Sequence, residues 1–275
     1  MRIQKLAILW NAEKTGAEAC ALAVKAAAEK LGATVTLTER HPVPENFLDG
    51  ADACCVIGGD GTILGVAESA AKKNVPIFGV NRGKLGYLAN YSTENIPESV
   101  ADVFAGRFRH VRLSLLECRA DGKSNAPTRL ALNDIVVKAR DNFKMTVLRV
   151  DSPRYGHVNT YHSDGIILTT STGSTAYSLG AGGPLIHSEA DVFALNPICP
   201  HTLSNRTLVL PRGMEIEIRN ETPGVPVGIS IDGGVALHGD DAFPLSVRMS
   251  ELRLSVIQPE GLSEFDILRK KLRWV

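Results

Sequence analysis

Apolar runs and amphipathic stretches alternate along the first hundred residues of the chain. Four short runs of apolar or β-branched residues predict strands, at residues 6–9, 34–38, 53–57 and 76–80. Between the first two, Cys20, Val24, Ala27 and Leu31 recur at helical spacing, and Gly32 marks the end of the predicted helix. Strands joined by helices are typical of a parallel sheet, so we expect an α/β domain here.

The pattern changes after Gly106. Several of the runs that follow alternate between apolar and polar residues, and turn-forming residues separate them. They predict strands at residues 112–119, 130–138, 145–150, 165–169, 206–210, 215–219, 227–231 and 252–257. One helix is expected from about Ser174 to Gly182. We therefore expect a β-rich domain with antiparallel, sandwich-like sheets.

An amphipathic helix is predicted at the end of the chain. Ser263 provides a helix-capping signal, and Phe265, Leu268 and Leu272 share one face of the helix that follows. We expect this apolar face to pack back onto the α/β domain. The predicted organisation is an α/β domain at 1–107, a β-rich domain at 108–258 and the returning helix in 259–275.

Composition narrows the choice of partners. The 275 residues are 44% hydrophobic and 22% charged, which is typical of a globular protein. Thirty basic residues balance thirty acidic ones, so no overall field draws the chain to nucleic acid or to a membrane surface. The five cysteines show no C-x-x-C spacing, and no apolar run is long enough to be a signal peptide or a membrane span. We expect a cytoplasmic protein.

The turn after the third strand carries the first candidate site. An acid stands among small residues that suit a strand-to-helix turn, namely Gly58, Gly59, Asp60, Gly61 and Thr62. Glycine permits positive φ and close approach of a ligand, and the N-terminus of the following helix favours phosphate. A carboxylate there repels phosphate unless it binds a metal or takes a proton from an attacking hydroxyl. The turn therefore suggests phosphoryl transfer, and the alternative is an ordinary turn with a helix-capping Asp60.

A second candidate site follows the predicted strand at 165–169. The stretch from Thr169 to Pro184 is rich in glycine, serine and threonine, so it offers many hydroxyl and bare N–H groups. Tyr177 provides a flat face on which a base can stack. Asp164 can accept from an exocyclic amine or a carboxamide. A nucleoside site is the better interpretation, and a glycine-rich connection is the alternative.

Two polar residues interrupt a third apolar run. Asp134 can accept from both hydroxyls of a ribose, as an acidic residue does in dinucleotide-binding folds, and Asn133 offers a donor and an acceptor to adenine. Taken alone, this pair favours a hairpin turn or bulge.

Taken together, these segments resemble the NAD kinase family. The resemblance rests on GGDGT at 58–62, GVNRGKLGYL at 79–88, LND at 132–134, DGIILTTSTGSTAYSLGAGGP at 164–184, PICPHTLSNRTLVLP at 197–211 and SIDGG at 230–234. It implies ATP-dependent phosphorylation of the adenosine 2′-hydroxyl of NAD to NADP, with NAD and ATP as partners. It also implies Mg²⁺ or another divalent cation, and a homodimer or homotetramer.

The resemblance assigns roles to individual residues. Asp60 matches the acid regarded as the catalytic base, with Gly61 beside it. The residues that match nucleotide contacts are Asn133, Asp134, Asp164, Thr175, Ala176, Tyr177 and Ser178. The chain departs from the usual pattern at Asp134, His162, Ser171, Gly180 and Gly234, and of these Asp134, His162 and Gly180 remain among the predicted nucleotide-binding residues. These departures leave open whether the protein prefers NAD or NADH. The alternatives to an NAD kinase are a diacylglycerol or sphingosine-type lipid kinase and a non-catalytic dinucleotide-binding regulator.

Overall fold

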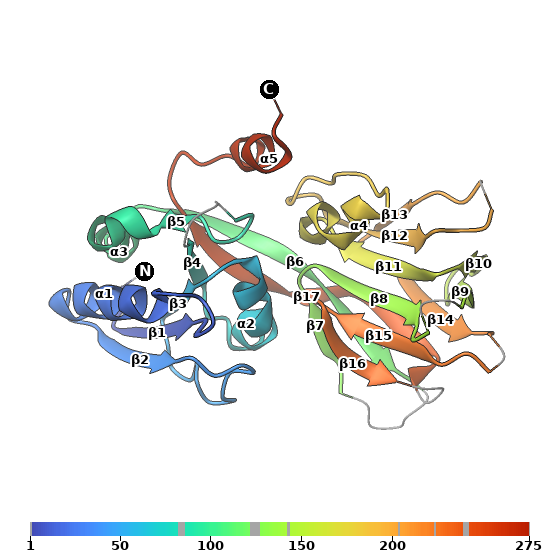
Figure 1. The fold of residues 1–275 in the computed structure, drawn as a ribbon, viewed down its shortest axis with the longest axis horizontal. Helices are drawn as coiled ribbons and strands as arrows, with labels where there is room; N and C mark the ends of the chain where they lie inside the picture. The colour runs from blue at the N-terminus through green and yellow to red at the C-terminus, as the bar shows by residue number, and fades with distance from the viewer. Residues whose placement is uncertain are drawn as a thin grey trace. The chain divides into compact units, whose positions relative to one another are not determined.

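The computed structural model describes residues 2–81, 86–121, 127–141, 144–202, 204–222, 224–238 and 242–274. The chain divides into two compact units (Figure 1). Unit 1 comprises Met1–Leu113 together with Leu254–Val275, and unit 2 comprises Ser114–Arg253. The strands β6 (Arg109–Ala120) and β17 (Leu245–Gln258) each continue from one unit into the other. The domain boundaries expected near residues 107 and 258 stay predictions.

A parallel sheet forms the centre of unit 1, as the alternating pattern predicts. Its central strands are, in spatial order, β2 (Thr34–Thr38), β1 (Lys5–Trp10), β3 (Ala53–Ile57) and β4 (Ile77–Asn81). The short β5 (Tyr91–Ser92) pairs in parallel with β4, and so does β17 at Val256. Every residue of β3 is buried, which explains its uninterrupted apolar sequence.

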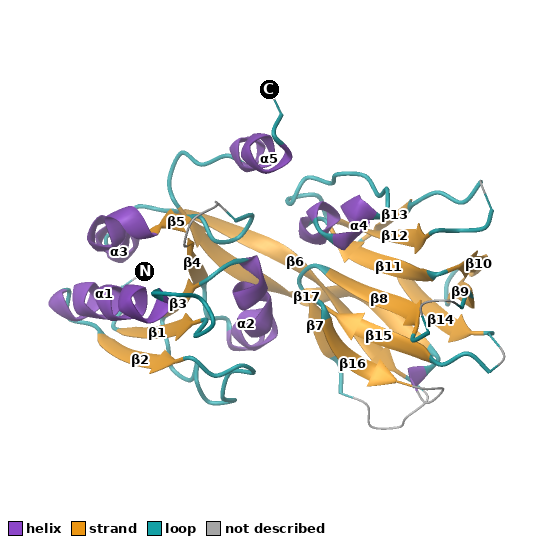
Figure 2. Cartoon of the chain, viewed as in Figure 1, coloured by secondary structure: helices purple, strands orange, loops and turns teal. Residues whose placement is uncertain are grey.

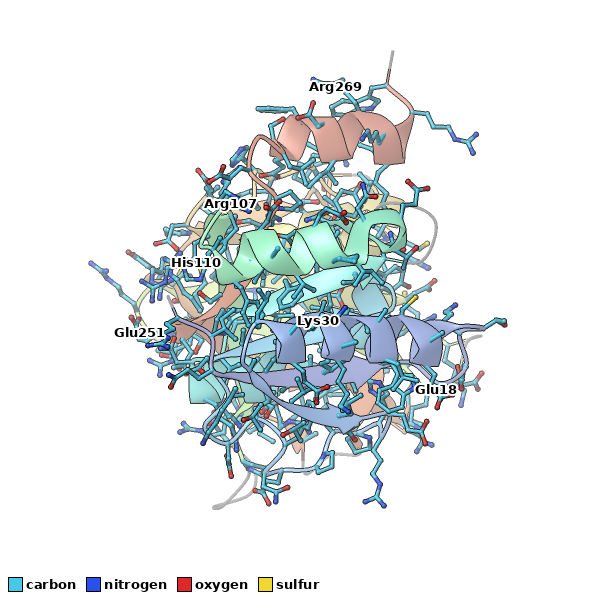
Figure 3. All side chains as sticks on the ribbon, turned by 90° about the vertical axis from the view of Figure 1, so that its left-hand side faces the viewer. Glu18, Lys30, Arg107, His110, Glu251 and Arg269 are labelled. Atoms are coloured by element: carbon cyan, nitrogen blue, oxygen red, sulfur yellow. The ribbon has the colours of Figure 1, made fainter. Side chains whose placement is uncertain are left out.

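Helices cover both faces of this sheet. In Figure 3, α1 (Ala17–Lys30) and α3 (Ile96–Phe104) lie in front of the strands, and both contribute to one hydrophobic core. The helix α2 (Asp60–Lys73) contacts β3 and β4 and lies behind them. Glu18 and Lys30, labelled at the two ends of α1, match the positive and negative ends of its dipole. The sequence analysis did not predict α3.

Unit 2 is a sandwich of antiparallel strands (Figure 2). One sheet has the order β13 (Leu208–Pro211), β12 (Val192–Ile198), β11 (Gly165–Thr170), β8 (Asp134–Ala139), β15 (Val227–Ile231) and β16 (Gly234–His238). The facing strands are β10 (Gly156–Ser163), β9 (Thr146–Ser152), β14 (Glu215–Asn220) and the first part of β17, with β6 and β7 (Arg129–Ala131). Alternate apolar residues of both layers form one core, as expected for a sandwich.

Several elements of unit 2 differ from the sequence expectation. The strands β10, β12 and β16 were not predicted, because β10 is largely polar and β12 contains Asn196 and Pro197. The strand expected at 130–138 is two strands, β7 and β8, separated by Leu132 and Asn133. The helix expected from about Ser174 is two short turns, a 3₁₀ turn η2 (Thr172–Thr175) and α4 (Tyr177–Gly180).

These two turns cover part of the outer face of the six-stranded sheet. Val136, Ile167 and Ile198 form a small apolar cluster on that face, and Ala181 packs against it. The chain therefore leaves the end of β11 and folds back over the sheet.

The terminal helix α5 (Glu264–Leu272) belongs to unit 1. Ser263 caps it in a capping box with Asp266. Ile267 and Leu268 are buried, whereas Phe265 is 55% exposed. The return to the α/β unit is confirmed, but the prediction that Phe265 belongs to the buried face is wrong, since Ile267 takes that place. None of the helices in the described ranges has the length and apolarity that crossing a membrane requires.

Candidate active site

Asp60 is the first residue of α2, directly beyond the buried strand β3. Its carboxylate accepts three backbone hydrogen bonds, from Tyr87 (2.9 Å), Leu88 (3.0 Å) and Ala89 (3.2 Å). A carboxylate has about four acceptor positions, so the described residues use three of them and leave one. Asp60 therefore holds the turn that follows β4 against the N-terminus of α2.

The glycines of this turn matter because they have no side chain, and not because their φ is positive. Gly58, Gly59 and Gly61 are not among the glycines with positive φ, so that expectation is wrong. A Cβ on Gly58 would collide with the side chain of Thr62, which is buried. Among the described residues, no atom lies within 4 Å of a Cβ built on Gly59 or Gly61. Gly58 is thus needed for packing, while the other two leave the start of α2 open.

The turn opposite Asp60 was not identified from the sequence as a separate feature. A Cβ on Gly86 would collide with Oδ1 of Asp60, and a Cβ on Gly79 would collide with Ala89. The close approach of this turn thus depends on two glycines of the GVNRGKLGYL segment. Residues 82–85 of that segment lie outside the described residues.

In unit 2, the carboxylate of Asp232 organises a second site. It accepts from the backbone N–H groups of Leu132 (2.8 Å), Asn133 (2.7 Å) and Asp134 (3.1 Å). Asp232 lies at the turn between β15 and β16 with φ of 49°, and its own N–H donates to the carbonyl oxygen of Asp134. The sequence indicated only a turn here, and SIDGG was the signal that marked it.

The break between β7 and β8 contacts the end of β11. The carbonyl oxygen of Asn133 accepts from the N–H of Thr170 (2.9 Å) and from the hydroxyl of Thr169 (3.2 Å). A Cβ on Gly173 would collide with that same carbonyl group. The structure thus brings together the LND segment and the start of the glycine-, serine- and threonine-rich segment.

Asp134 is a buried carboxyl group beside another carboxylate. Its side chain belongs to a residue only 5% exposed. Burial, and then the charge of Asp232, raises the pKa of Asp134 to about 7. Near neutral pH this carboxyl group is a donor in one protonation state and an acceptor in the other.

The four residues from Thr175 to Ser178 are placed differently from one another. Tyr177 is 44% exposed, and Thr175 and Ala176 are half-buried. Ser178 is fully buried, and its carbonyl oxygen accepts from the side chain of Asn196 (3.1 Å). Tyr177 therefore presents its ring to solvent, whereas Ser178 anchors the turn to β12.

The other residues predicted to contact the nucleotide lie at different positions along β11. Asp134 pairs with Thr169 near one end of the strand, whereas Asp164 precedes Gly165 at the other. Six strand residues span about 17 Å, so Asp134 and Asp164 do not contact the same nucleoside within one chain. His162 is exposed at the end of β10, and Gly180 is exposed in α4. These predicted residues are spread in a track along β11 rather than gathered in one compact cluster.

Comparison with known families decides the assignment. The model of the ATP-NAD kinase N-terminal domain matches residues 7–108, and that of the ATP-NAD kinase C-terminal domain matches residues 132–258. The chain belongs to the ATP-NAD kinase family. As a member of that family it is an ATP-dependent NAD kinase, which forms NADP. This activity replaces the lipid kinase and the non-catalytic regulator as alternatives.

Relatives cover most of the chain. It is 37% identical over 231 residues to an NAD kinase of Magnetococcus marinus, which is 84% of this chain and 76% of the relative. It is 36% identical over 254 residues to an NAD kinase of Variovorax paradoxus, which is 91% of this chain and 83% of the relative.

Two solved structures share the fold. An NAD kinase from Archaeoglobus fulgidus in complex with ATP is 25% identical, with a TM-score of 0.79 over 98% of this chain and 99% of its own. Yeast NADH kinase complexed with NADH is 22% identical, with a TM-score of 0.87 over 100% of this chain and 88% of its own. The second likeness concerns the fold alone.

Proposed function

We propose that Asp60 is the general base of the NAD kinase reaction. Its carboxylate accepts the proton of the adenosine 2′-hydroxyl as that oxygen attacks the γ-phosphorus of ATP. A new O–P bond forms, the bond to the bridging oxygen breaks, and ADP leaves. The observation that carries this proposal is a carboxylate on which the described residues leave one acceptor position, held at the start of α2.

The start of α2 suits the phosphates of ATP. The N-terminus of a helix offers unpaired N–H groups and the positive end of the dipole. No atom of the part of the chain that the structure describes lies within 4 Å of the Cβ position of Gly59 or Gly61, which leaves room for a phosphate to approach the backbone there. We assign Gly58 and Thr62 a packing role in the same turn, since each limits the space of the other.

We assign NAD to the track along β11. Asn133 and Asp134 hold the adenine and the ribose, and the exposed ring of Tyr177 stacks on a base. Asp164 and His162, at the far end of the strand, contact the other nucleoside. Thr175, Ala176 and Gly180 contribute the backbone of the turn between them, and buried Ser178 holds that turn in place.

A divalent cation, Mg²⁺ for example, accompanies ATP in this proposal. Within the described ranges, no group of three His, Cys, Asp or Glu side chains is arranged to hold a metal. An Mg²⁺ ion that accompanies a nucleotide is usually held mainly by the substrate phosphates, so it needs no such cluster. When bound, the ion offsets the negative charge of the phosphates.

We also propose a homo-oligomer in the cytoplasm. β13 is an edge strand of the six-stranded sheet, and its residues Leu208 and Val209 are 37% and 51% exposed. An apolar edge strand is a surface on which a second copy can pair. Sedimentation of Val209→Lys against the wild type tests the interface, and an unchanged mass would exclude this edge.

All five cysteines are free thiols, which suits a reducing compartment.

Asp60→Asn tests the assignment of the base. NADP formation from NAD, ATP and Mg²⁺ should fall by roughly 10²–10⁴-fold, and the limb of the pH–rate profile that reports the base should disappear. Asp102→Asn is the control, because Asp102 is an acid on α3 that pairs with Arg107. A folded Asp60→Asn protein that turns over within a few-fold of the wild type would exclude Asp60 as the base.

A further inference from the structure

The terminal helix carries a cation whose position is defined by its neighbours. Ile267 and Leu268 are buried, which sets the rotation of α5. Lys271 lies one turn beyond Ile267 and therefore on the same side of the helix. Its Nζ lies 5.4 Å from the centroid of the Tyr87 ring, within the range of a cation–π interaction.

The other cations of α5 are placed differently. Arg269, labelled on α5 in Figure 3, pairs with Asp266 of the same helix. Lys270 is an exposed neighbour that makes no such contact with an aromatic ring of the described residues. Lys271 is thus distinguished by what it touches rather than by its charge.

Tyr87 connects this contact to Asp60. Its N–H donates to Oδ2 of Asp60, and the next two N–H groups donate to Oδ1. Burial, and then the charge of Asp60, raises the pKa of the Tyr87 hydroxyl, so the ring lies within the field of that carboxylate. A force that holds the ring also holds the three donors that orient Asp60.

We propose that Lys271 is a positioning residue, which holds Tyr87 and through it the turn that orients the Asp60 carboxylate. This inference rests on the proposed role of Asp60 as the base. The turn contains Gly86, where a Cβ would collide with Oδ1 of Asp60, so no side chain at that residue can help to hold the turn. Without the Lys271 cation, the turn should spend less time in the position from which its N–H groups donate to Asp60.

The first test separates Lys271 from its neighbour. Lys271→Met should lower kcat by about 2–5-fold, the range expected for one cation–π contact at an exposed site. The Michaelis constants for ATP and NAD should change little, because Lys271 touches neither substrate in this proposal. Lys271→Arg should restore most of kcat, since a guanidinium also binds an aromatic face. Lys270→Met should match the wild type.

A double-mutant cycle with Tyr87 decides whether the effect passes through the ring. Tyr87→Phe keeps the ring, and Tyr87→Leu removes it. Lys271→Met should lower kcat in the Tyr87→Phe protein but have no further effect in the Tyr87→Leu protein. An equal effect in both backgrounds would overturn the proposal, and so would a Lys271→Met protein that matches Lys270→Met.

Two further measurements keep the proposals distinguishable. Unfolding midpoints of all variants show whether kcat falls merely because the protein is less stable. In that case kcat should recover in the Lys271→Arg protein only as far as its unfolding midpoint recovers. If Asp60→Asn retains activity, the base assignment fails whatever Lys271 does. If Asp60→Asn is inactive while Lys271→Met keeps full kcat, only the positioning role fails.

Discussion

Gly86 leaves the space that the carboxylate of Asp60 occupies. A Cβ at residue 86 would collide with Oδ1 of Asp60 and lie tightly against its carboxyl carbon, although 26 positions separate the two residues in the sequence numbering. The glycine is therefore part of the same site as the acid. Its requirement is steric, since the turn must come close enough for three N–H groups to reach one carboxylate.

Gly86→Ala should reduce turnover far more than an ordinary alanine substitution. The added methyl group must displace Asp60 or the turn, and a misplacement of about 1 Å can cost about 10²-fold in rate. Steady-state kinetics with NAD and ATP measure this, with Gly213→Ala as the control because a Cβ at Gly213 meets nothing within 4 Å. Equal activity of the two variants would show that the turn is not held against Asp60.

Asp134→Asn should change how stability depends on pH. The folded pKa, raised to about 7, exceeds the unfolded value of about 3.9, so this group favours the folded state fully below pH 4. That contribution is lost as pH rises to about 7, by up to about 4 kcal/mol at 1.4 kcal/mol per unit. Asn does not ionise, so the variant should gain stability relative to the wild type between pH 4.5 and 7.5.

Urea unfolding at both pH values measures this difference. Asp151→Asn provides a control of opposite sign, because its hydrogen bond from Arg149 lowers the pKa of Asp151. Removal of that charge should cost stability at neutral pH, and the cost should fade as the solution becomes acidic. A constant difference between Asp134→Asn and the wild type across the range would contradict the raised pKa.

Tyr177→Ala should weaken NAD binding selectively. Stacking of a base on an aromatic ring contributes roughly 1–3 kcal/mol, so the Michaelis constant for NAD should rise by about 5–150-fold while that for ATP changes little. Tyr155→Ala is the matched control, since Tyr155 is 64% exposed and contacts Arg154 instead. If the Michaelis constant for ATP rises instead, Tyr177 contacts ATP, and the track along β11 binds ATP rather than NAD.

Removal of residues 262–275 should destabilise unit 1. Burial of Ile267 and Leu268 contributes roughly 1.5–3 kcal/mol each relative to exposure. Leu268→Ala alone should cost about 2–5 kcal/mol, whereas Leu22→Ala on the exposed side of α1 should cost far less. Thermal unfolding measures both, and an unchanged midpoint in a soluble truncated protein would mean that α5 does not stabilise its own chain.

The periodicity of the sequence was enough to predict the parallel sheet of unit 1 and the sandwich of unit 2. Buried parallel strands such as β3 are apolar throughout, and the helices between them carry their own spacing, so both signals are local. Strands without a clear local apolar pattern were not predicted, because the prediction depends on that local signal. β10 is an edge strand with mostly polar residues, and β12 contains a buried Asn196 that serves the adjoining turn.

The sequence by itself predicted which residues carry chemistry, because Asp60, the LND segment and the glycine-, serine- and threonine-rich segment have compositions that packing alone does not require. Tertiary structure decided how they are held. Asp232 supports the 132–134 break across about a hundred residues of sequence, and Gly86 makes room for Asp60. Tertiary burial also raises the pKa of Asp134. Such effects depend on atoms that are distant in sequence, and local patterns contain no record of that proximity.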